Sequence, residues 1–440
     1  MKEFLTAQYA SRILAPLSIL LVLMVGYRIW AKRITPEKIL AGQVLFEHEW
    51  TRFDSLSHQG DGLGPVFNDV SCVACHFQGG VGGAGPNSKN VQKFTVLPTQ
   101  ERKNVYRGVI HKEATHAGLK EDFEQVAKQY PVIRGETVRK GCYTVREPDL
   151  VPVISTSINT PALFGLGLIE KIPDYTIAYH GSAKAVTAVA NELRGKFSSR
   201  GIGRVKMSGT RVGKFGWQGE FGTIEEFVAE ACAVELGLSV PGRRQDKAQE
   251  FTEDRSAKYD LNHQQLHELV CFVKSLPRPQ QRLPTDPEEK LRATQGEKVF
   301  QAVGCADCHV PDMGGVDGIY SDFHLYKLTS LKSDGYDPML RNRKIAFPFS
   351  ETAPNEWKTP PLWGVADSAP YFHDGSAETL KMAIDLHRGD AEYSRQKFKE
   401  SSPRDQTALV AFLKTLRAPQ SVAPFSGAKL ANTETSEDQD

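Results

Sequence analysis

The sequence predicts a mainly α-helical fold made of two versions of one design, preceded by a membrane-anchor helix. Helical spacing of apolar residues recurs around two cysteine pairs, no strand-rich region stands out, and the N-terminal part contains a continuous apolar run. The predicted parts are an anchor at 1–33, two domains with long loops at 34–282 and 283–420, and a disordered acidic tail at 421–440.

Composition places the chain among ordinary globular proteins of more than one domain. It has 440 residues, 40% of them apolar, with 54 basic and 53 acidic side chains and a formal net charge of +1. This excludes wholesale disorder, collagen-like repeats and a membrane protein with many spans. The balanced charge also excludes the strong positive field that nucleic acid attracts, so no nucleic-acid partner is expected.

The N-terminal apolar run has basic residues on both sides. Residues 13–27 are almost wholly apolar, and Arg28, Lys32 and Arg33 follow. The length lies between that of a signal-peptide core and a full membrane span. Because no small-x-small cleavage site follows, an uncleaved anchor is favoured over a removed signal. A buried soluble helix is the remaining alternative.

Both halves of the chain show the same order of elements: a helix, a cysteine pair followed by His, a Thr-Pro-x-Leu segment and a closing helix that stops at proline. The matching elements are helices at 36–50 and 286–300, segments at 159–165 (NTPALFG) and 358–364 (KTPPLWG), and closing helices at 269–279 and 409–419. A polar linker with proline, 280–285, separates the halves, and the glycine-rich stretch 60–85 is predicted as loop.

Each half carries one Cys-x-x-Cys-His motif, formed by Cys72, Cys75 and His76 in the first half and by Cys305, Cys308 and His309 in the second. Two thiols at this spacing can form thioethers with both vinyl groups of one porphyrin, and the adjacent His can ligate its iron. Zinc sites and disulfides also use paired cysteines. Zinc, however, would need four ligands in each half, and a disulfide needs no adjacent His.

Two covalently bound haem c groups are therefore the predicted cofactors. Haem is attached to such motifs outside the bacterial cytoplasm, so the predicted location is the cell inner membrane, with a single span and the body in the periplasm. The cysteines outside the motifs, Cys142, Cys232 and Cys271, are expected to be inert core thiols.

Three segments, 63–83, 159–174 and 359–375, resemble the di-haem oxidoreductase family of c-type cytochromes. That family is similar to bacterial di-haem cytochrome c peroxidases and to the di-haem enzyme that matures a tryptophan-derived quinone cofactor. The resemblance extends over about 39–416 and implies two cytochrome-c-like domains with one haem each. It supplies no substrate, and it leaves open whether calcium lies between the domains.

The resemblance also implies which haem is closed. The related peroxidases carry a Met ligand fourteen residues after the His of a Tyr-Phe-His-Asp-Gly-Ser segment. Here that His is His373, and His387 stands fourteen residues after it. His387 is thus the predicted second ligand of the second haem, which lowers its potential relative to Met. A helix-end histidine stabilised by the helix dipole is the alternative. His373 is expected near the haem edge, and the rival ligand Met382 in the core.

The first half lacks a matching ligand. Aligning Thr223 with Thr379 puts Ala231 at the position of His387, and alanine cannot ligate iron. The first haem is therefore predicted to be open to hydrogen peroxide or another small oxidant. The residues that could close it instead are Cys232 and Met207.

An open haem needs an acid/base group, and the resemblance points to Glu235 in an Ala-Val-Glu-Leu-Gly segment. A solvated helix-end carboxylate is the alternative for Glu235, and an exposed helix face is expected for Glu225, Glu226 and Glu230. The related enzymes also carry a Trp between the haems. The corresponding stretch, 149–158, has no aromatic residue. Trp217 and Trp363 could take its place, but a packed core role is the default expectation for each.

The predicted function is thus a membrane-anchored periplasmic di-haem c-type oxidoreductase, peroxidase-like, that exchanges electrons with a periplasmic redox partner protein. Two alternatives remain. One is an electron-transfer cytochrome without substrate chemistry. The other is an oxidase of a protein or organic substrate that works through a high-valent iron–oxo state.

Overall fold

The structure is a computed structural model that describes residues 33–96, 106–115, 137–140, 143–146, 153–193, 203–245, 258–328, 352–353 and 355–420. Within these ranges, no helix is both long and apolar enough to cross a membrane. The predicted anchor (except for its last residue), the predicted acidic tail and Cys142 lie outside the described residues.

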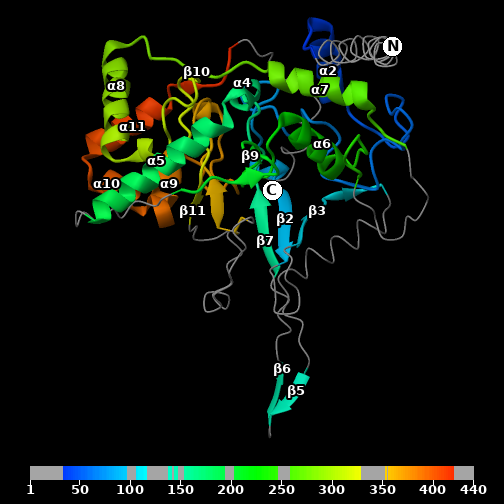
Figure 1. The fold of residues 1–440 in the computed structure, drawn as a ribbon, viewed down its shortest axis with the longest axis horizontal. Helices are drawn as coiled ribbons and strands as arrows, with labels where there is room; N and C mark the ends of the chain where they lie inside the picture. The colour runs from blue at the N-terminus through cyan, green and yellow to red at the C-terminus, as the bar shows by residue number, and fades with distance from the viewer. Residues whose placement is uncertain are drawn as a thin grey trace, which may run out of the picture.

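Two pairs of crossed helices form much of the helical body (Figure 1). α2 (Pro36–Glu47) packs on α7 (His263–Ser275), and α8 (Pro287–Ala302) packs on α11 (Pro403–Leu413). These are the four helices predicted from apolar spacing, although the closing helices begin and end several residues earlier than predicted. The other helices are α4 (Leu166–Lys171), α5 (Asp174–Leu193), α6 (Ile224–Glu235), α9 (Leu380–Leu386) and α10 (Glu392–Glu400).

A glycine brings the two backbones into contact at each crossing. A Cβ atom at Gly42 of α2 would overlap the carbonyl oxygen of Glu268 on α7. A Cβ atom at Gly296 of α8 would overlap the carbonyl oxygen of Ala408 on α11. The two halves therefore repeat one helix packing at matching positions.

Polar residues in the sequence cap these helices. The side chains of Thr35, Asp286 and Ser402 each accept a backbone N–H at the start of α2, α8 and α11, where proline occupies the first turn. Thr223 and Asn262 complete capping boxes at the start of α6 and α7. The caps Thr35 and Asp286 agree with the predicted starts of α2 and α8, whereas Asn262 and Ser402 begin the closing helices α7 and α11 earlier than predicted.

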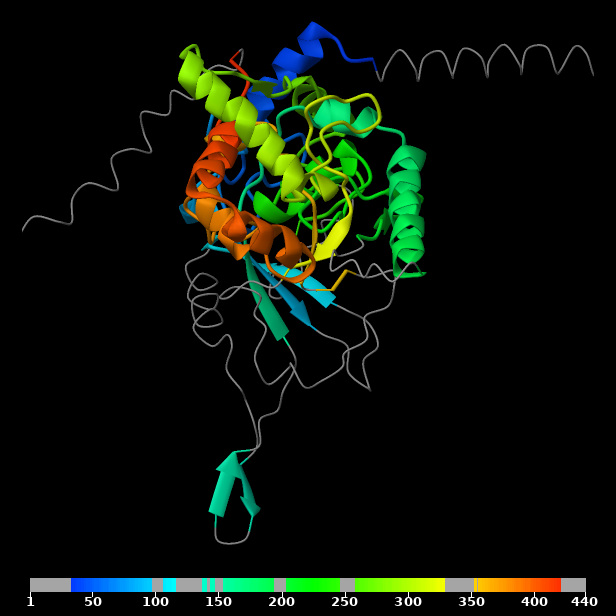
Figure 2. The same cartoon turned by 90° about the vertical axis from the view of Figure 1, so that its left-hand side faces the viewer.

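Several described stretches between the first cysteine motif and the first Thr-Pro segment are β-strands, so the prediction of a mainly α-helical fold is corrected to a mixed one. β2 (Val91–Val96) is the centre of an antiparallel sheet between β3 (Tyr106–Ile110) and β7 (Val153–Ile158). β5 (Thr137–Lys140) and β6 (Tyr143–Arg146) pair as a hairpin (Figures 1 and 2). These strands are short, and β2 finds its partner β7 far along the chain, so the pattern is weak in the sequence.

Short antiparallel pairs connect other parts of the described chain. They are β1 (Val66–Phe67) with β4 (Glu113–Ala114), β8 (Met207–Ser208) with β9 (Arg211–Val212), β10 (Gln280–Gln281) with β13 (Leu416–Arg417), and β11 (Leu325–Lys327) with β12 (Glu356–Lys358). The β10–β13 pair fixes the start of the predicted linker against the end of the second closing helix. The domain boundaries themselves stay a prediction.

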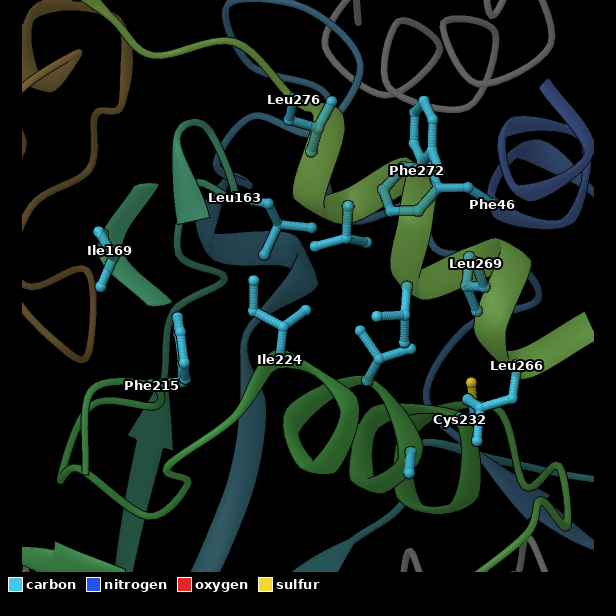
Figure 3. Close-up of a cluster of buried hydrophobic side chains, with 14 of the residues drawn as sticks. Phe46, Leu163, Ile169, Phe215, Ile224, Cys232, Leu266, Leu269, Phe272 and Leu276 are labelled. Carbon is cyan, nitrogen blue, oxygen red and sulfur yellow. The ribbon is translucent and has the colours of Figure 1, made fainter. Parts of the chain in front are cut away.

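The buried apolar side chains form two clusters. The larger one fills the space around α6 and α7 and includes Ile224, Leu266 and Phe272 (Figure 3). The smaller one is built around Phe300 and Phe412, on α8 and α11. Each cluster surrounds one of the crossed helix pairs.

Candidate haem sites

The first cysteine motif is a single turn that follows α2. The amides of Cys75 and His76 both donate to the carbonyl oxygen of Cys72, at 3.2 and 3.0 Å, so both thiols and the imidazole project from one turn. Nδ1 of His76 lies 3.1 Å from the carbonyl oxygen of Gly83. Burial lowers the pKa of His76 to about 4. The imidazole is therefore neutral at pH 7, the form that binds a metal.

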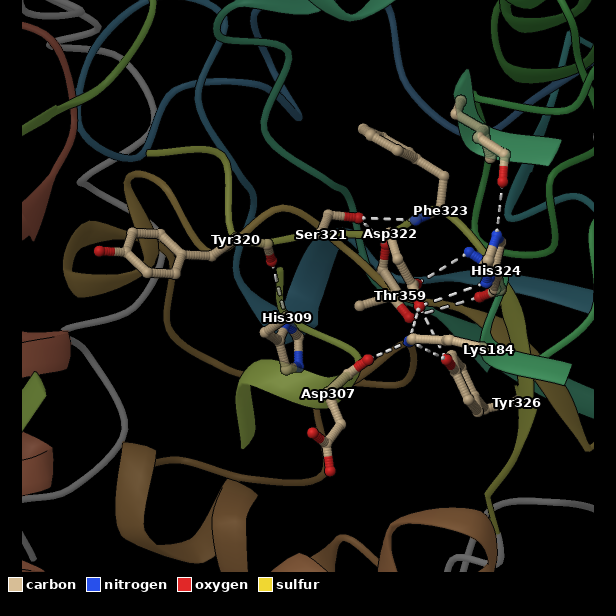
Figure 4. Close-up of polar contacts among 11 residues, drawn as sticks. Lys184, Asp307, His309, Tyr320, Ser321, Asp322, Phe323, His324, Tyr326 and Thr359 are labelled. Carbon is tan, nitrogen blue, oxygen red and sulfur yellow. Dashed lines mark hydrogen bonds and ion pairs between the residues drawn. The ribbon is translucent and has the colours of Figure 1, made fainter. Parts of the chain in front are cut away.

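The second cysteine motif repeats this turn. The amides of Cys308 and His309 both approach the carbonyl oxygen of Cys305, at 3.4 and 3.0 Å. Nδ1 of His309 lies 3.0 Å from the carbonyl oxygen of Tyr320 (Figure 4). Burial lowers the pKa of His309 to about 4, so this imidazole is also neutral at pH 7.

Matching aromatic rings pack beside the two histidines. The ring centre of Phe46, on α2, is 6.2 Å from that of His76. The ring centre of Phe300, on α8, is 6.5 Å from that of His309. Backbone turn, histidine and neighbouring ring all repeat, so the two motifs are suited to holding the same group.

The four motif thiols lie in apolar surroundings. Burial raises the pKa of Cys72, Cys305 and Cys308 to about 12 and raises that of Cys75 as well. None of the four forms a disulfide. Among the described residues, no three His, Cys, Asp or Glu side chains gather as they would around a metal ion. Two sulfurs on one turn with a histidine directly after them would suit the two thioether bonds and the iron ligand of a covalently bound haem.

A buried polar network lies behind the second motif (Figure 4). Nζ of Lys184, on α5, is 2.8 Å from Oδ2 of Asp322, and the hydroxyl of Tyr326 donates to the same carboxylate at 2.7 Å. Lys184 also donates to the carbonyl oxygen of Asp307, inside the motif. Although burial opposes ionisation, the hydrogen bond from His324 and the charge of Lys184 hold the pKa of Asp322 well below its usual range. The network ties α5 to the second motif.

His387 faces His309 across the second site. It is the C-cap of α9, and the two ring centres are 6.4 Å apart with an interplanar angle of 62°. Nδ1 of His387 lies 2.6 Å from the carbonyl oxygen of Ala383, which leaves Nε2 as the nitrogen with a lone pair. Two neutral imidazoles this close together, each with its Nδ1 turned toward a backbone carbonyl group, would suit holding the iron of one haem between them.

The surroundings of His387, Met382 and His373 can each be compared with the expectation from the sequence. Burial lowers the pKa of His387, which disfavours a charged helix-end histidine. Met382 is 42% exposed, so its predicted place in the core is wrong, and it is no rival ligand. His373 is buried and stacks on Trp357, with ring centres 3.5 Å apart and an interplanar angle of 12°.

A cavity of about 310 Å³ extends from the second site toward the first half. Among the residues that line it are Cys305, Cys308, His309, His387, His373, Trp217, Trp357, Trp363 and Lys358, together with the charged residues Lys214, Asp307, Asp390 and Arg395. Paired sulfurs, opposed neutral imidazoles and aromatic walls form a donor set that suits a haem. Both sequence-predicted tryptophans, Trp217 and Trp363, belong to this wall.

In the first half, the position that matches His387 is occupied by Ala231. Thr223 caps α6 and Thr379 caps α9, and an isolated antiparallel bridge precedes each cap at the same spacing. The caps lie 156 residues apart, as do Ala231 and His387. The structure therefore supports the alignment made from the sequence, and no side chain on α6 corresponds to the opposed imidazole.

The two alternative ligands of the first haem have other surroundings. Cys232 is 1% exposed and belongs to the apolar cluster beside Leu266 (Figure 3). Met207 lies on β8 with 49% of its surface exposed. Cys232 and Cys271 are both buried, as expected for core thiols, and Cys232 lies close enough to Cys72 of the first motif for the two thiols to interact electrostatically.

Glu235 ends α6 close to the first cysteine motif. Its Oε2 accepts a hydrogen bond of 2.6 Å from the side-chain amide of Asn68, and its charge interacts with the thiol of Cys75. Burial raises the pKa of Glu235, although Asn68 and the nearby cations Lys93 and Lys112 oppose this shift. A buried carboxyl group with a raised pKa holds its proton more firmly than a solvated one, which suits a group that takes up and releases a proton.

The other glutamates of α6 have surface or structural roles. Glu225 is exposed, and Glu226 forms the capping box with Thr223. Glu230 forms an ion pair of 2.6 Å with Arg243. Of the carboxylates on α6, Glu235 is the one set apart by its burial and its position.

Sequence reasoning missed Asn68, Trp357 and Lys358. Asn68 is 7% exposed, and both its backbone and its side chain hydrogen-bond to Glu235. Lys358 is the first residue of the second Thr-Pro segment and Trp357 directly precedes it, and that position was the available signal. The region 149–158, which lacks an aromatic residue, contributes β7 rather than an electron relay.

The two halves exchange backbone hydrogen bonds beside the cavity. The amide of Asn159 donates to the carbonyl oxygen of His373 at 2.6 Å, and the amide of Lys358 donates to that of Trp217 at 2.8 Å. Asn159 and Lys358 begin the two Thr-Pro segments, and Trp217 and His373 are 156 residues apart, like the caps. Each Thr-Pro segment thus binds the segment that precedes α6 or α9 in the other half.

Comparison with known proteins agrees with the resemblance seen in the sequence. Residues 247–416 match the family model described as "Di-haem oxidoreductase, putative peroxidase". The chain is 30% identical over 127 residues to cytochrome c551 peroxidase of Nitrosomonas europaea, and 33% identical over 129 residues to that of Pseudomonas aeruginosa. Each match covers 29% of this chain and 34% of the relative, so the chain spans about a third of the length of these relatives.

Among solved structures, hydrazine synthase of Kuenenia stuttgartiensis is similar with 14% identity and a TM-score of 0.40. The superposition covers 87% of this chain and 88% of that chain. A likeness at this score supports no conclusion about activity.

Proposed function

Because residues 247–416 match the di-haem oxidoreductase family, we propose that this chain is a di-haem c-type oxidoreductase with a peroxidase-like layout. The first haem is held by Cys72, Cys75 and His76, and the second by Cys305, Cys308, His309 and His387. Bound haem supplies redox-active iron. The protein residues fix its ligands, its surroundings and the protons it needs.

The difference between His387 and Ala231 carries this proposal. At the second site, His309 and His387 lie with their ring centres 6.4 Å apart; both would hold the iron, which would suit a haem that only transfers electrons. At the first site, Ala231 in the matching position leaves the distal face open to a small oxidant such as hydrogen peroxide. The cytochrome c551 peroxidases among the relatives fit this assignment of the substrate.

Glu235 is the proposed acid/base of the first site. Its carboxyl group lies within electrostatic range of Cys75, and burial raises its pKa. Asn68 holds Oε2 through a 2.6 Å hydrogen bond, which orients the group. Such a carboxyl can accept a proton from one peroxide oxygen and return it to the other.

Electrons reach the first site from the second across the joint between the halves. The stacked rings of Trp357 and His373, together with Trp217, provide aromatic side chains along the wall of the cavity. A periplasmic redox protein is the proposed partner. The apolar run at 13–27 supports anchoring in the inner membrane, and the two haem-attachment motifs support a periplasmic body.

Spectroscopy of the two haems tests the proposal. We expect one high-spin haem that reacts rapidly with hydrogen peroxide in stopped-flow mixing, and one low-spin haem that does not. Two low-spin haems and no reaction with peroxide would instead identify an electron carrier. A reaction with peroxide that proceeds without any electron-donor protein but consumes an added organic reductant would favour the oxidase alternative.

A further inference from the structure

Lys358 is a buried cation whose ammonium group has no partner in the described part of the chain. It ends β12 and is 7% exposed. Its Nζ lies 5.5 Å from the ring centre of Phe323, and no described residue forms a hydrogen bond or ion pair with it. The other buried lysine, Lys214, is fully satisfied, since it donates to the carbonyl oxygen of Ile172 at 2.5 Å and pairs with Asp174 at 2.7 Å.

The two carboxylates near Lys358 form their hydrogen bonds and ion pairs with other residues. Asp322 binds Lys184 and Tyr326, and Glu220 is paired with Lys93 at 3.2 Å. Burial lowers the pKa of Lys358 to about 8, although the charges of Glu220 and Asp322 oppose this shift. The group is therefore still mostly protonated at pH 7, and a buried charge without a counter-ion is costly.

The cavity that Lys358 lines contains all four residues of the second haem site and none of the first motif. Trp357 lines it too, and its indole N–H is buried without a hydrogen-bond partner among the described residues. In the first half, the matching residue is the neutral Asn159, whose side chain is satisfied by Gly85 at 3.1 Å and Asn90 at 2.8 Å. The second site thus has two donors, the indole N–H of Trp357 and the charged ammonium group of Lys358, that form no hydrogen bond with a described residue.

We infer that Lys358 is the counter-ion of a carboxylate in this cavity, supplied by a propionate of the second haem. The inference rests on the proposed function, because it needs haem at the second site. Haem brings two carboxylates, and a buried carboxylate needs a cation as much as Lys358 needs an anion. The Lys358 ion pair keeps this propionate ionised when the iron changes its charge.

The test is a redox titration of the second haem in Lys358→Met and Lys358→Arg, with Lys381→Met as the control. Lys381, on α9, is an exposed residue paired with Asp385, and its loss removes the same charge outside the cavity. At pH 7.5 and a fixed ambient potential, Lys358→Met should lower the ratio of reduced to oxidised second haem about tenfold or more. At pH 5.5 the difference should close, because the unpaired propionate takes up a proton.

Lys358→Arg and Lys381→Met should behave like the wild type. If Lys358→Met folds poorly, Lys358→Gln replaces it as the uncharged variant. If the carboxylate came from solution and not from the haem, the ratio of reduced to oxidised second haem in the wild type would respond to acetate but not to chloride at equal ionic strength. Lys358→Met would then abolish that response. Ratios equal to those of the wild type at both pH values, with no effect of acetate, overturn the inference. Haem content and spin state are measured first, because they test the proposed function separately from the role of Lys358.

Discussion

His309 and His387 face each other with their ring centres 6.4 Å apart, and each ring turns its Nδ1 toward a backbone carbonyl group. The carbonyl partners, Tyr320 and Ala383, orient the rings and leave Nε2 of each for a metal. Each imidazole is thus oriented by its own backbone contact, and together the two would suit the iron of a haem at the proposed second site.

Replacing His387 with Met should raise the potential of the second haem, because a thioether ligand favours the reduced iron. A Met–iron charge-transfer band should appear in the absorption spectrum of the oxidised protein. Redox titration of the variant measures the potential. The exposed His263, changed to Met, is the control and should leave both haems unchanged. Unaltered spectra and potentials in His387→Met would remove it from the ligand set.

Replacing both cysteines of one motif should remove one covalent haem and leave the other. Cys72→Ala with Cys75→Ala tests the first site, and Cys305→Ala with Cys308→Ala tests the second. Pyridine-haemochrome quantitation should give two haems per wild-type chain and one in each double variant. The buried pair Cys232→Ala and Cys271→Ala is the matched control and should retain two. A wild-type count of one or three contradicts the assignment.

Glu235→Gln should slow the reaction of the first haem with peroxide about a hundredfold or more, since a positioned acid/base group contributes about 10²–10⁴-fold. The amide has the same shape and can keep the contact with Asn68. Haem content and the potential of the second haem should not change. Glu225→Gln, on the exposed face of the same helix, is the control. An unchanged rate in stopped-flow mixing would clear Glu235 of this role.

The raised pKa of Glu235 also predicts a pH dependence of stability. Burial disfavours the ionised carboxyl in the folded state, so its contribution to stability is fully present below the unfolded pKa of about 4.3 and is lost as pH rises through the higher folded pKa. Glu235→Gln should therefore raise the melting temperature relative to the wild type at pH 7.5 more than at pH 4. Thermal unfolding at the two pH values measures this. A larger gain at pH 4 would show that the folded carboxyl has a lowered pKa.

Gly296→Ala should destabilise the second half by about 1–3 kcal/mol, because the added Cβ overlaps the carbonyl oxygen of Ala408 where α8 crosses α11. Denaturant unfolding measures the change in free energy. Gln301→Ala, an exposed position on the same helix, should change it by less than about 0.5 kcal/mol. Equal effects of the two substitutions would mean that the helices separate easily at this crossing.

The parts of the fold that the sequence predicted are those set by local signals. The starts of α2 and α8 follow from Thr35 and Asp286, each placed before a proline. Aligning the two halves required only the two helix caps, Thr223 and Thr379, and the number of residues that follow each cap. The structure agrees with the resulting match between Ala231 and His387.

The parts that could not be predicted depend on contacts between distant segments. β2 is six residues long, and its pairing with β7 joins Val91 to Ile158, so neither strand is marked by its neighbours in sequence. The stack of Trp357 on His373 likewise exists only once the second Thr-Pro segment lies against the segment before α9. Such features depend on packing between segments that are far apart in the sequence, and the periodicity of apolar residues does not reveal that packing.

The hydrogen bonds from Asn159 to His373 and from Lys358 to Trp217 use main-chain atoms only. The side chains at these four positions can therefore diverge while the joint between the halves keeps its geometry. Trp217 in the first half corresponds to His373 in the second, and Asn159 in the first half corresponds to Lys358 in the second. A repeated scaffold of this kind would let the two proposed haem sites take different tasks, because the side chains can differ while the backbone contacts between the halves stay the same.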